Sequence, residues 1–369
     1  MQEGVTASYG FIGLGLIGGS IARAIRDAEP DARIIAYDPD AEALGQAKDD
    51  GVVNDVLSEI GTGFTGVDVL FLCAPVAVNN ENLRRVKPYL APSTTVTDIG
   101  SVKGPIHETV IKLGLERQFI GSHPMTGSER TGYRNSKASL LENAYYILTH
   151  TDGVEIDRIA QMQSLAEKIG AIPFTLTAEE HDYVTGVVSH LPHVISATLV
   201  NLVQDADDGL QTMKQIAAGG FKDITRISSS SPELWQQICL MNRDNLVALL
   251  DRYIEALGQA KNTIANRKEA LLKDFFDKAR TYRESFTDAV AGPIGQTFVL
   301  YVEIADMAGA IAGALTLLSD GGVNIKNIGI THNREAAYGS MMLEFYDDVA
   351  LRQAHALLYQ KGYAVTMRT

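Results

Sequence analysis

The sequence predicts an α/β protein in which a doubly wound parallel sheet is followed by an all-helical domain and then by a smaller domain of strands and helices. Three observations predict this order. Residues 8–99 alternate short apolar runs with helical patterns, as parallel sheets with crossover helices do. Residues 178–286 have the periodicity of long helices. Residues 297–367 follow the order strand, helix, strand, strand, helix, strand. We therefore expect domains at residues 1–175, 176–290 and 296–369.

Length and composition indicate a soluble globular protein with a small-molecule substrate. A chain of 369 residues is too long for one ordinary core, and 46% hydrophobic with 21% charged residues is typical of globular proteins. A net charge of -13 argues against a nucleic-acid or membrane partner, because such surfaces attract clustered Lys and Arg.

The cysteine content and the N-terminal segment favour a cytoplasmic location. Cys73 and Cys239 are far apart in apolar runs, so we interpret them as reduced core residues rather than a disulfide or metal site. The apolar segment at residues 9–25 has no basic start and contains five glycines, so it does not resemble a signal peptide.

The first expected strand, residues 8–12, leads into a glycine-rich turn and a helix. Gly13, Gly15 and Gly18 form the pattern G-x-G-x-x-G in this setting. Gly13 would allow the tight turn, Gly15 the close approach of a pyrophosphate, and Gly18 the packing of helix on strand. The amides of Leu16 and Ile17 would face the phosphates at the helix N-terminus. The alternative is a glycine-rich turn without a ligand.

The second expected strand, residues 33–37, ends at Asp38, twenty positions beyond Gly18. A carboxylate there accepts hydrogen bonds from the adenosine ribose and repels a 2'-phosphate. Pro39 and Asp40 supply no compensating cation. The sequence therefore predicts a Rossmann-type domain that binds NAD rather than NADP.

Two further strands, at residues 67–73 and 94–99, each end in a polar or angular turn that we expect near the nicotinamide. Ala74 and Pro75 follow the first, and Ser101 and Lys103 follow the second. Ser101 could donate a hydrogen bond to a substrate oxygen, and Lys103 could attract a carboxylate. Ser101 could equally be a helix N-cap.

Residues 119–129, FIGSHPMTGSE, contain the candidate base. They look too polar and angular for a strand interior, so we expect a loop after a strand, with Ser128 in it as a substrate contact. His123 titrates near neutral pH and can accept a proton from a bound hydroxyl. The alternative is a surface-loop histidine.

The helical middle begins with a capping box, Thr177 to Glu180, which predicts a helix from Ala178. Its polar stripe, which includes Asp182 and His193, needs a ligand or another helix as partner. Pro192 should kink the helix. The histidines that could suggest a metal do not have the spacing of two ligands on one helix face, so no metal site is expected: they are His181, His190 and His193.

A cation follows the expected turn at residues 219–225. Arg226 could grip a carboxylate with two parallel hydrogen bonds, or it could be a solvated surface arginine. Ser231 with Pro232 predicts the next helix start. Residues 242–286 are expected to be helical and apolar on one side without a sheet to cover, which predicts a homodimer.

Several motifs together resemble the prephenate dehydrogenase family of tyrosine biosynthesis, in the form with a C-terminal ACT regulatory domain. These motifs are GLGLIGGS at 13–20, DIGSVK at 98–103, SHPMTGSE at 122–129, EHD at 180–182, SHLPH at 189–193 and FKDITRI at 221–227. The resemblance implies that His123 accepts the proton of the ring 4-hydroxyl, that Ser101 helps hold it, and that Arg226 binds a substrate carboxylate. It also implies that His181 and His193 line the site.

The C-terminal βαββαβ pattern, which is ferredoxin-like, follows a glycine and proline linker at residues 291–295. Asp306 and Gly309 lie where its first strand turns into a helix, and Asn324 follows the next glycine pair. ACT domains receive free amino acids at such positions, so the resemblance implies feedback regulation by L-tyrosine.

Two other functions remain open at this stage. Arogenate dehydrogenase would act on the amino counterpart of prephenate, and Met125 and Thr126, which depart from many relatives, leave this preference undecided. A non-catalytic nucleotide-dependent amino-acid sensor would use the same domains. The joint presence of His123, Ser101 and Arg226 argues against the sensor, which needs no base.

Overall fold

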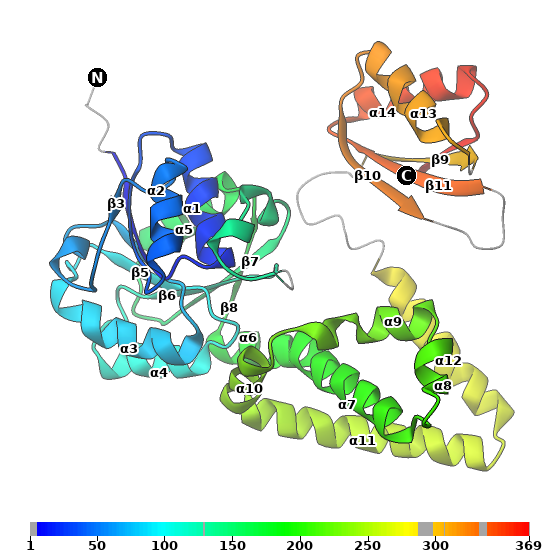
Figure 1. Cartoon of the computed structure of the whole chain (residues 1–369), viewed down its shortest axis with the longest axis horizontal. Coiled ribbons are helices and arrows are strands. Elements are labelled where there is room, and N and C mark those ends of the chain that lie inside the picture. Colours follow the sequence, from blue (N-terminus) through cyan, green and yellow to red (C-terminus); the bar gives the residue numbers. More distant parts are fainter. Residues whose placement is uncertain (1–5, 128–129, 287–297, 306, 332–337, 369) are drawn as a thin grey trace. The chain divides into compact units, whose positions relative to one another are not determined.

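The structure is a computed structural model that describes residues 6–127, 130–286, 298–305, 307–331 and 338–368 (Figure 1). Ser128 and Asp306, which the sequence singled out, lie outside the described residues. The chain divides into two compact units, Met1–Arg267 and Lys268–Thr369. The first unit contains the nucleotide-binding domain and most of the helical domain.

The nucleotide-binding domain is built on a parallel sheet of five strands in the order β3-β2-β1-β4-β5. Its strands are β1 (Ser8–Ile12), β2 (Arg33–Tyr37), β3 (Asp55–Val56), β4 (Val69–Leu72) and β5 (Thr95–Asp98). Its helices are α1 (Leu16–Ala28), α2 (Ala41–Asp49), α3 (Val76–Val86) and α4 (Gly104–Lys112). Chain order runs outward from β1 in both directions, so the prediction of a doubly wound sheet is confirmed.

A smaller sheet of three strands, in the order β6-β7-β8, continues this domain. Its strands are β6 (Ile120–Pro124), β7 (Tyr145–His150) and β8 (Ile172–Leu176), with α5 (Ile156–Lys168) between the last two. β6 pairs antiparallel with β7, and Phe119, the residue before β6, forms a parallel bridge to Val96 of β5.

His123 lies inside β6, so the prediction of a loop at this position was wrong. Its register partner is Ile147 on β7, and Pro124 ends the strand opposite Tyr146. β6 is an outer strand of its sheet, where a proline that lacks an N–H is tolerated. Ser122, His123 and Pro124 therefore belong to a short strand, whereas residues 125–127 follow it outside any strand or helix. The pairing of the strand fixes the direction of the His123 side chain.

The first helix of the helical domain begins as predicted at Ala178, with a capping box formed by Thr177 and Glu180. It comprises α6 (Ala178–Thr185), a π-helical turn η5 (Gly186–His190), α7 (Leu191–Ala206), α8 (Thr212–Ile216), α9 (Gly219–Thr225), a 3-10 turn η6 (Arg226–Ser229), α10 (Pro232–Met241) and α11 (Arg243–Ala265). Ser231 caps α10 through the amide of Leu234, as predicted.

One local prediction in this domain was wrong, because Gly219 and Gly220 open helix α9 instead of forming a turn. Pro192 lies inside the continuous helical stretch Ala178–Ala206, directly after the π-turn η5, so the helix is irregular next to the position where the sequence predicted a kink. At that turn a Cβ on Gly186 would come within 3.1 Å of Leu249, so the absent side chain lets α11 approach closely.

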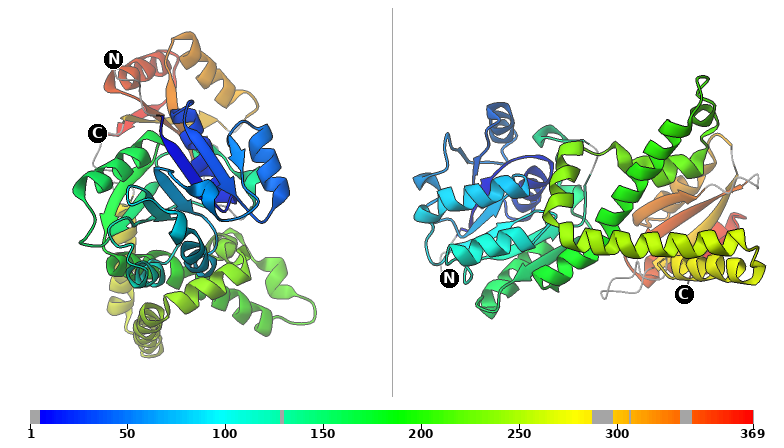
Figure 2. Two further views of the ribbon diagram at one scale, coloured as in Figure 1. Left: turned by 90° about the vertical axis from the view of Figure 1, so that its left-hand side faces the viewer. Right: turned by 90° about the horizontal axis from the view of Figure 1, so that it is seen from below.

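Much of the apolar surface of this domain is exposed. Ser196 is the one buried residue of α7, whereas Val188 is 62% and Leu202 63% exposed. Within the described residues, Ala178–Ala206 is the single helical stretch long and apolar enough to cross a membrane by length and composition. The right-hand view in Figure 2 shows α11 extending away from the nucleotide-binding sheet. The exposed apolar side chains of this domain are therefore available for contact with a partner.

The second unit holds α12 (Glu269–Ser285) and an antiparallel sheet of four strands in the order β10-β11-β9-β12. Its other elements are β9 (Phe298–Ala305), α13 (Ala310–Asp320), β10 (Ile325–Thr331), β11 (Tyr338–Phe345), α14 (Asp348–Gln360) and β12 (Val365–Arg368). Leu300, Val302 and Leu358 lie in its core. The predicted βαββαβ order is confirmed.

Candidate active site

The glycine turn after β1 has the shape of an anion-binding site. Gly13 has φ +101°, and a Cβ there would lie 2.8 Å from the amide nitrogen of Ala74. A Cβ on Gly18 would lie 2.8 Å from the Gly13 carbonyl oxygen, so helix and strand pack without room for a side chain. A Cβ on Gly15 would meet nothing within 4 Å, so space lies open beside the turn.

Helix α1 begins beside that space without an acidic residue in its first turn. Gly15 is its N-cap and has no side chain to satisfy the first amides, among them those of Leu16 and Ile17. Unsatisfied amides at a helix N-terminus favour a phosphate. The residues present therefore fit a dinucleotide.

Asp38, half-buried after β2, holds this turn in place. One carboxylate oxygen accepts from the amide of Leu14 at 2.6 Å, and the other accepts from the amide of Asp40 at 2.8 Å. Each oxygen keeps lone pairs for a further donor such as a ribose hydroxyl.

The two turns expected near the nicotinamide are held by polar contacts that sequence reasoning missed. Asn79 of α3 is buried, accepts from the amide of Ala74 at 3.1 Å and donates to the Leu72 carbonyl at 3.0 Å. Pro75 is the N-cap residue of α3. Ser101 is not the N-cap of α4, because that helix starts at Gly104 with Lys103 as N-cap.

Lys103 and Asp98 form a fully buried ion pair beneath β6. The Lys103 ammonium lies 2.6 Å from both oxygens of Asp98 and donates to the Ser122 carbonyl at 2.7 Å. Burial lowers the pKa of Lys103, and the adjacent Asp98 opposes that shift. Because these three contacts use the three ammonium donors, the group does not face an open site. The expectation that Lys103 attracts a substrate carboxylate does not agree with this geometry.

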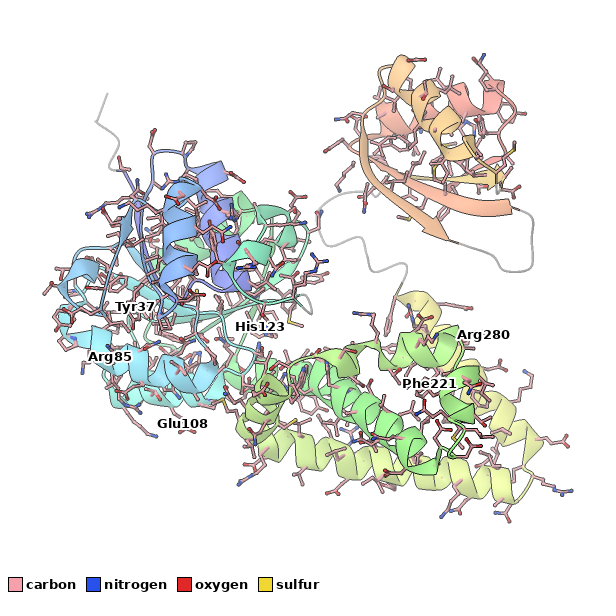
Figure 3. The ribbon with its side chains drawn as sticks, viewed as in Figure 1. Tyr37, Arg85, Glu108, His123, Phe221 and Arg280 are labelled. Atoms are coloured by element: carbon pink, nitrogen blue, oxygen red, sulfur yellow. The ribbon has the colours of Figure 1, made fainter. Side chains whose placement is uncertain are left out.

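His123, His181 and Asp182 form a continuous row of hydrogen bonds. His123 Nδ1 lies 2.8 Å from His181 Nε2, and His181 Nδ1 lies 2.8 Å from Asp182 Oδ1. The Asp182 carboxylate also accepts from the amides of Lys103, at 2.7 Å, and Gly104, at 2.8 Å, at the start of α4. The two domains of this unit therefore meet at the candidate base, which Figure 3 labels beside α6.

This environment shifts the pKa of each member of the row. Burial is the main cause that lowers the pKa of His123 well below 6.5, and the charges of His181, Lys103 and His190 add to it. Burial also lowers the pKa of His181. For Asp182 burial acts to raise the pKa, but the hydrogen bonds from His181, Lys103 and Gly104 outweigh it and keep the pKa below its ordinary value.

His193 and Trp235 form the wall of a cavity of about 560 Å³ between α7, η6 and α10. Their rings stack with centroids 3.5 Å apart, and His193 Nδ1 donates to the Ser189 carbonyl at 3.0 Å. Arg226, the first residue of η6, is close enough for its charge to lower the pKa of His193, although burial is the larger cause. The role of Arg226 as a carboxylate ligand stays a prediction.

His190 lies on the π-turn η5. Its ring nitrogen Nδ1 lies 3.0 Å from the side-chain amide nitrogen of Asn242. Burial lowers its pKa to about 4. Among the residues that the structure describes, no group of three or more His, Cys, Asp and Glu could hold a metal ion.

Comparison with known families shows matches along most of the chain. Residues 21–173 match the nucleotide-binding domain of prephenate dehydrogenase, and residues 177–278 match the dimerisation domain of the same family. A prephenate dehydrogenase of Bacillus subtilis is 33% identical over 359 residues, which are 95% of this chain and 97% of that protein.

Two further relatives match a shorter part of the chain. A cyclohexadienyl dehydrogenase of Zymomonas mobilis is 32% identical over 74% of this chain and 93% of its own length. A solved structure of prephenate dehydrogenase from A. aeolicus, in complex with hydroxyphenyl propionate and NAD+, has 30% identity and a TM-score of 0.73. That similarity covers 77% of this chain and 100% of the solved chain.

Proposed function

The chain belongs to the prephenate dehydrogenase family, and from this premise we propose that it converts prephenate to 4-hydroxyphenylpyruvate by NAD-dependent oxidative decarboxylation, a step of tyrosine biosynthesis. The observation that carries the proposal is the contact of His123 with His181 across the two matched domains. A buried base of lowered pKa, at the contact between the helical domain and the domain whose glycine turn fits a dinucleotide, suits proton removal from a bound hydroxyl.

The residues of this chain have separate roles in the proposal. His123 accepts the proton of the ring 4-hydroxyl as a hydride leaves the carbon that bears it, and bound NAD supplies the hydride acceptor. Loss of carbon dioxide then makes the ring aromatic, and His123 returns its proton to the phenolate oxygen. Ser101 helps hold the hydroxyl, and Arg226 binds a carboxylate beside His193. Ser128 remains a proposed substrate contact.

The substrate is tested by NADH formation with prephenate and with arogenate in turn. We expect higher kcat/KM with prephenate. Higher kcat/KM with arogenate would assign the chain to that alternative, and turnover of neither would favour the amino-acid sensor.

Activity should persist into acidic solution. A general base must be neutral, and an unshifted histidine would lose activity as the pH falls through about 6.5. Because burial and neighbouring positive charge lower the pKa of His123, protonation requires more acid, so the acidic limb of kcat/KM should lie below pH 6.5. A pH profile with prephenate checks this, and an inflection at or above 6.5 would contradict it.

Asp38→Ser should lower kcat/KM with NAD and raise kcat/KM with NADP relative to it. The serine hydroxyl is shorter than the carboxylate and carries no charge, so it no longer repels a 2'-phosphate. The measurement is the ratio of kcat/KM for the two cofactors. Since Asp38 also accepts from Leu14 and Asp40, general damage to the turn would lower both values together and leave the ratio unchanged. An unchanged ratio would mean that Asp38 does not select the cofactor.

We also propose that the enzyme is a homodimer and that it is located in the cytoplasm. The matched dimerisation domain coincides with the exposed apolar surface of α7 and α11. Leu202 and Ile254 are exposed there, and a second copy would cover them. Both cysteines are free, which agrees with a reducing compartment.

L-tyrosine should inhibit the full-length enzyme through the C-terminal domain, which we propose is an ACT domain. Gly309, with φ +87°, is the N-cap of α13, and Asn324 directly precedes β10. The Zymomonas relative matches 74% of this chain over 93% of its own length, so part of this chain has no counterpart in that relative. A tyrosine preference of about 1 to 3 kcal/mol for a less active state would give roughly 5- to 150-fold inhibition.

Truncation after Gly292 tests this assignment. Prephenate turnover should remain in the truncated enzyme, and its inhibition by L-tyrosine should disappear. Equal inhibition of both forms would place tyrosine at the catalytic site instead.

A further inference from the structure

The proton arrangement in the row from Asp182 to His123 follows from the donors around the carboxylate. Asp182 Oδ1 faces the Lys103 amide and His181 Nδ1, while Oδ2 faces the Gly104 amide. Both amides can only donate, and together with the N-terminus of α4 they stabilise an ionised carboxylate. An ionised carboxylate only accepts, so the proton of this contact lies on His181 Nδ1.

The direction of the hydrogen bond between His181 and His123 follows from the one between Asp182 and His181. His181 is fully buried, which favours its neutral form, and a neutral ring that carries its proton on Nδ1 has a lone pair on Nε2. That lone pair faces His123 Nδ1 at 2.8 Å, so His123 Nδ1 must carry the proton and donate. The lone pair of His123 is then on Nε2.

We propose that Asp182 is a positioning residue which, through His181, fixes the tautomer of His123 so that Nε2 is its basic nitrogen. A doubly protonated His181 would donate from Nε2 to His123 Nδ1 and place the His123 proton on Nε2, where it blocks the base. Burial keeps His181 neutral although Asp182 acts to raise its pKa, and the contact with Asp182 fixes the single ring proton on Nδ1. The inference concerns the same site and rests on the proposed role of His123 as general base.

The same row stabilises the charge that His123 acquires. A proton from the substrate hydroxyl enters at Nε2 and makes an imidazolium, whose Nδ1 proton remains shared with His181 and whose charge Asp182 opposes. The charged groups around the pair are Lys103 and His190 near His123, and Lys103, Asp98 and Asp182 near His181. Asp182 is the carboxylate that contacts His181 directly, whereas the Asp98 carboxylate is paired with Lys103.

The tautomer can be read without substrate from ring nitrogen spectra of the full-length enzyme labelled with ¹⁵N-histidine, with His123 assigned by its absence in His123→Asn. We expect a protonated Nδ1 and an unprotonated Nε2 at neutral pH. In Asp182→Asn we expect signals of the other tautomer. A His123 ring that carries its proton on Nε2 in the parent enzyme would overturn the inference.

Kinetics of matched His181 variants separate positioning from packing. His181→Gln places an amide oxygen near the position of Nε2, so it can still accept from His123 Nδ1 and should keep kcat for prephenate within about tenfold. His181→Leu removes the acceptor and should lower kcat by about 10²-fold with little change in KM. An equal loss in both variants would contradict the role of the acceptor.

The pH dependence of Asp182→Asn gives a second test, because loss of a residue with only a packing role would not shift the pH profile. Loss of the negative charge should shift the acidic limb of kcat/KM to lower pH and lower kcat by about 10²-fold. An unshifted limb would contradict the inference. If the spectra show the expected tautomer but prephenate is not turned over, the proposed function fails while the tautomer assignment stands.

Discussion

Replacing His123 by Asn should lower kcat for prephenate by about 10²- to 10⁴-fold, the usual contribution of a general base, with little change in KM. Asn is the informative choice because its amide can donate to His181 Nε2 in place of Nδ1, at a contact that is 2.8 Å in the parent. The row of hydrogen bonds is kept while the basic nitrogen is lost. Steady-state kinetics with both substrates varied checks this.

Thermal unfolding of His123→Asn serves as the control. A variant that unfolds at the parental temperature and still turns prephenate over at the parental rate would remove His123 from the mechanism. Comparable losses in stability and activity would instead point to damage of β6.

Replacing Lys103 by Met should lower the free energy of unfolding by about 3–5 kcal/mol, because it leaves the Asp98 carboxylate buried without its partner. Both side chains are 0% exposed, and the ammonium also donates to the carbonyl of Ser122, the residue before His123. Denaturant unfolding followed by Trp235 fluorescence reports on the unit that holds this pair, since the chain has one tryptophan.

The matched control for this prediction is the double variant Lys103→Met with Asp98→Asn. It removes the uncompensated charge, so it should recover part of the lost stability. A Lys103→Met protein as stable as the parent would show that the pair contributes nothing measurable.

Local patterns predicted the elements whose conformation depends on nearby residues. The glycine turn and Asp38 predicted the parallel sheet. The turn needs φ +101° at Gly13 and leaves no room for a side chain at Gly18, and both requirements are visible as glycines in a short stretch of sequence. The capping box at Thr177 and the Ser231 cap likewise depend on contacts within four residues. Such signals are contained in short stretches of sequence.

The failures depend on contacts between distant segments. Polar composition around His123 suggested a loop, but pairing with β7, more than twenty residues later, makes it a strand. The partners of Lys103 are Asp98 and the carbonyl of Ser122, and only the fold shows that they consume its donors.

The polar stripe of the first long helix is an intermediate case. The sequence showed that Asp182 needed a partner, and the structure identifies it as the N-terminus of α4 together with His181. The contact between His123 and His181 spans 58 positions. The family resemblance placed both residues in one site, but no local pattern in either segment predicted the hydrogen bond between them.

The most direct measurement of the central claim, that His123 is the base of an oxidative decarboxylation, follows NADH and carbon dioxide in one reaction with prephenate and NAD. The parent enzyme should form the two products in equal amounts. His123→Asn should keep that ratio at a rate that is lower by about 10²- to 10⁴-fold. NADH formed without carbon dioxide, or an equal rate in the variant, would contradict the claim.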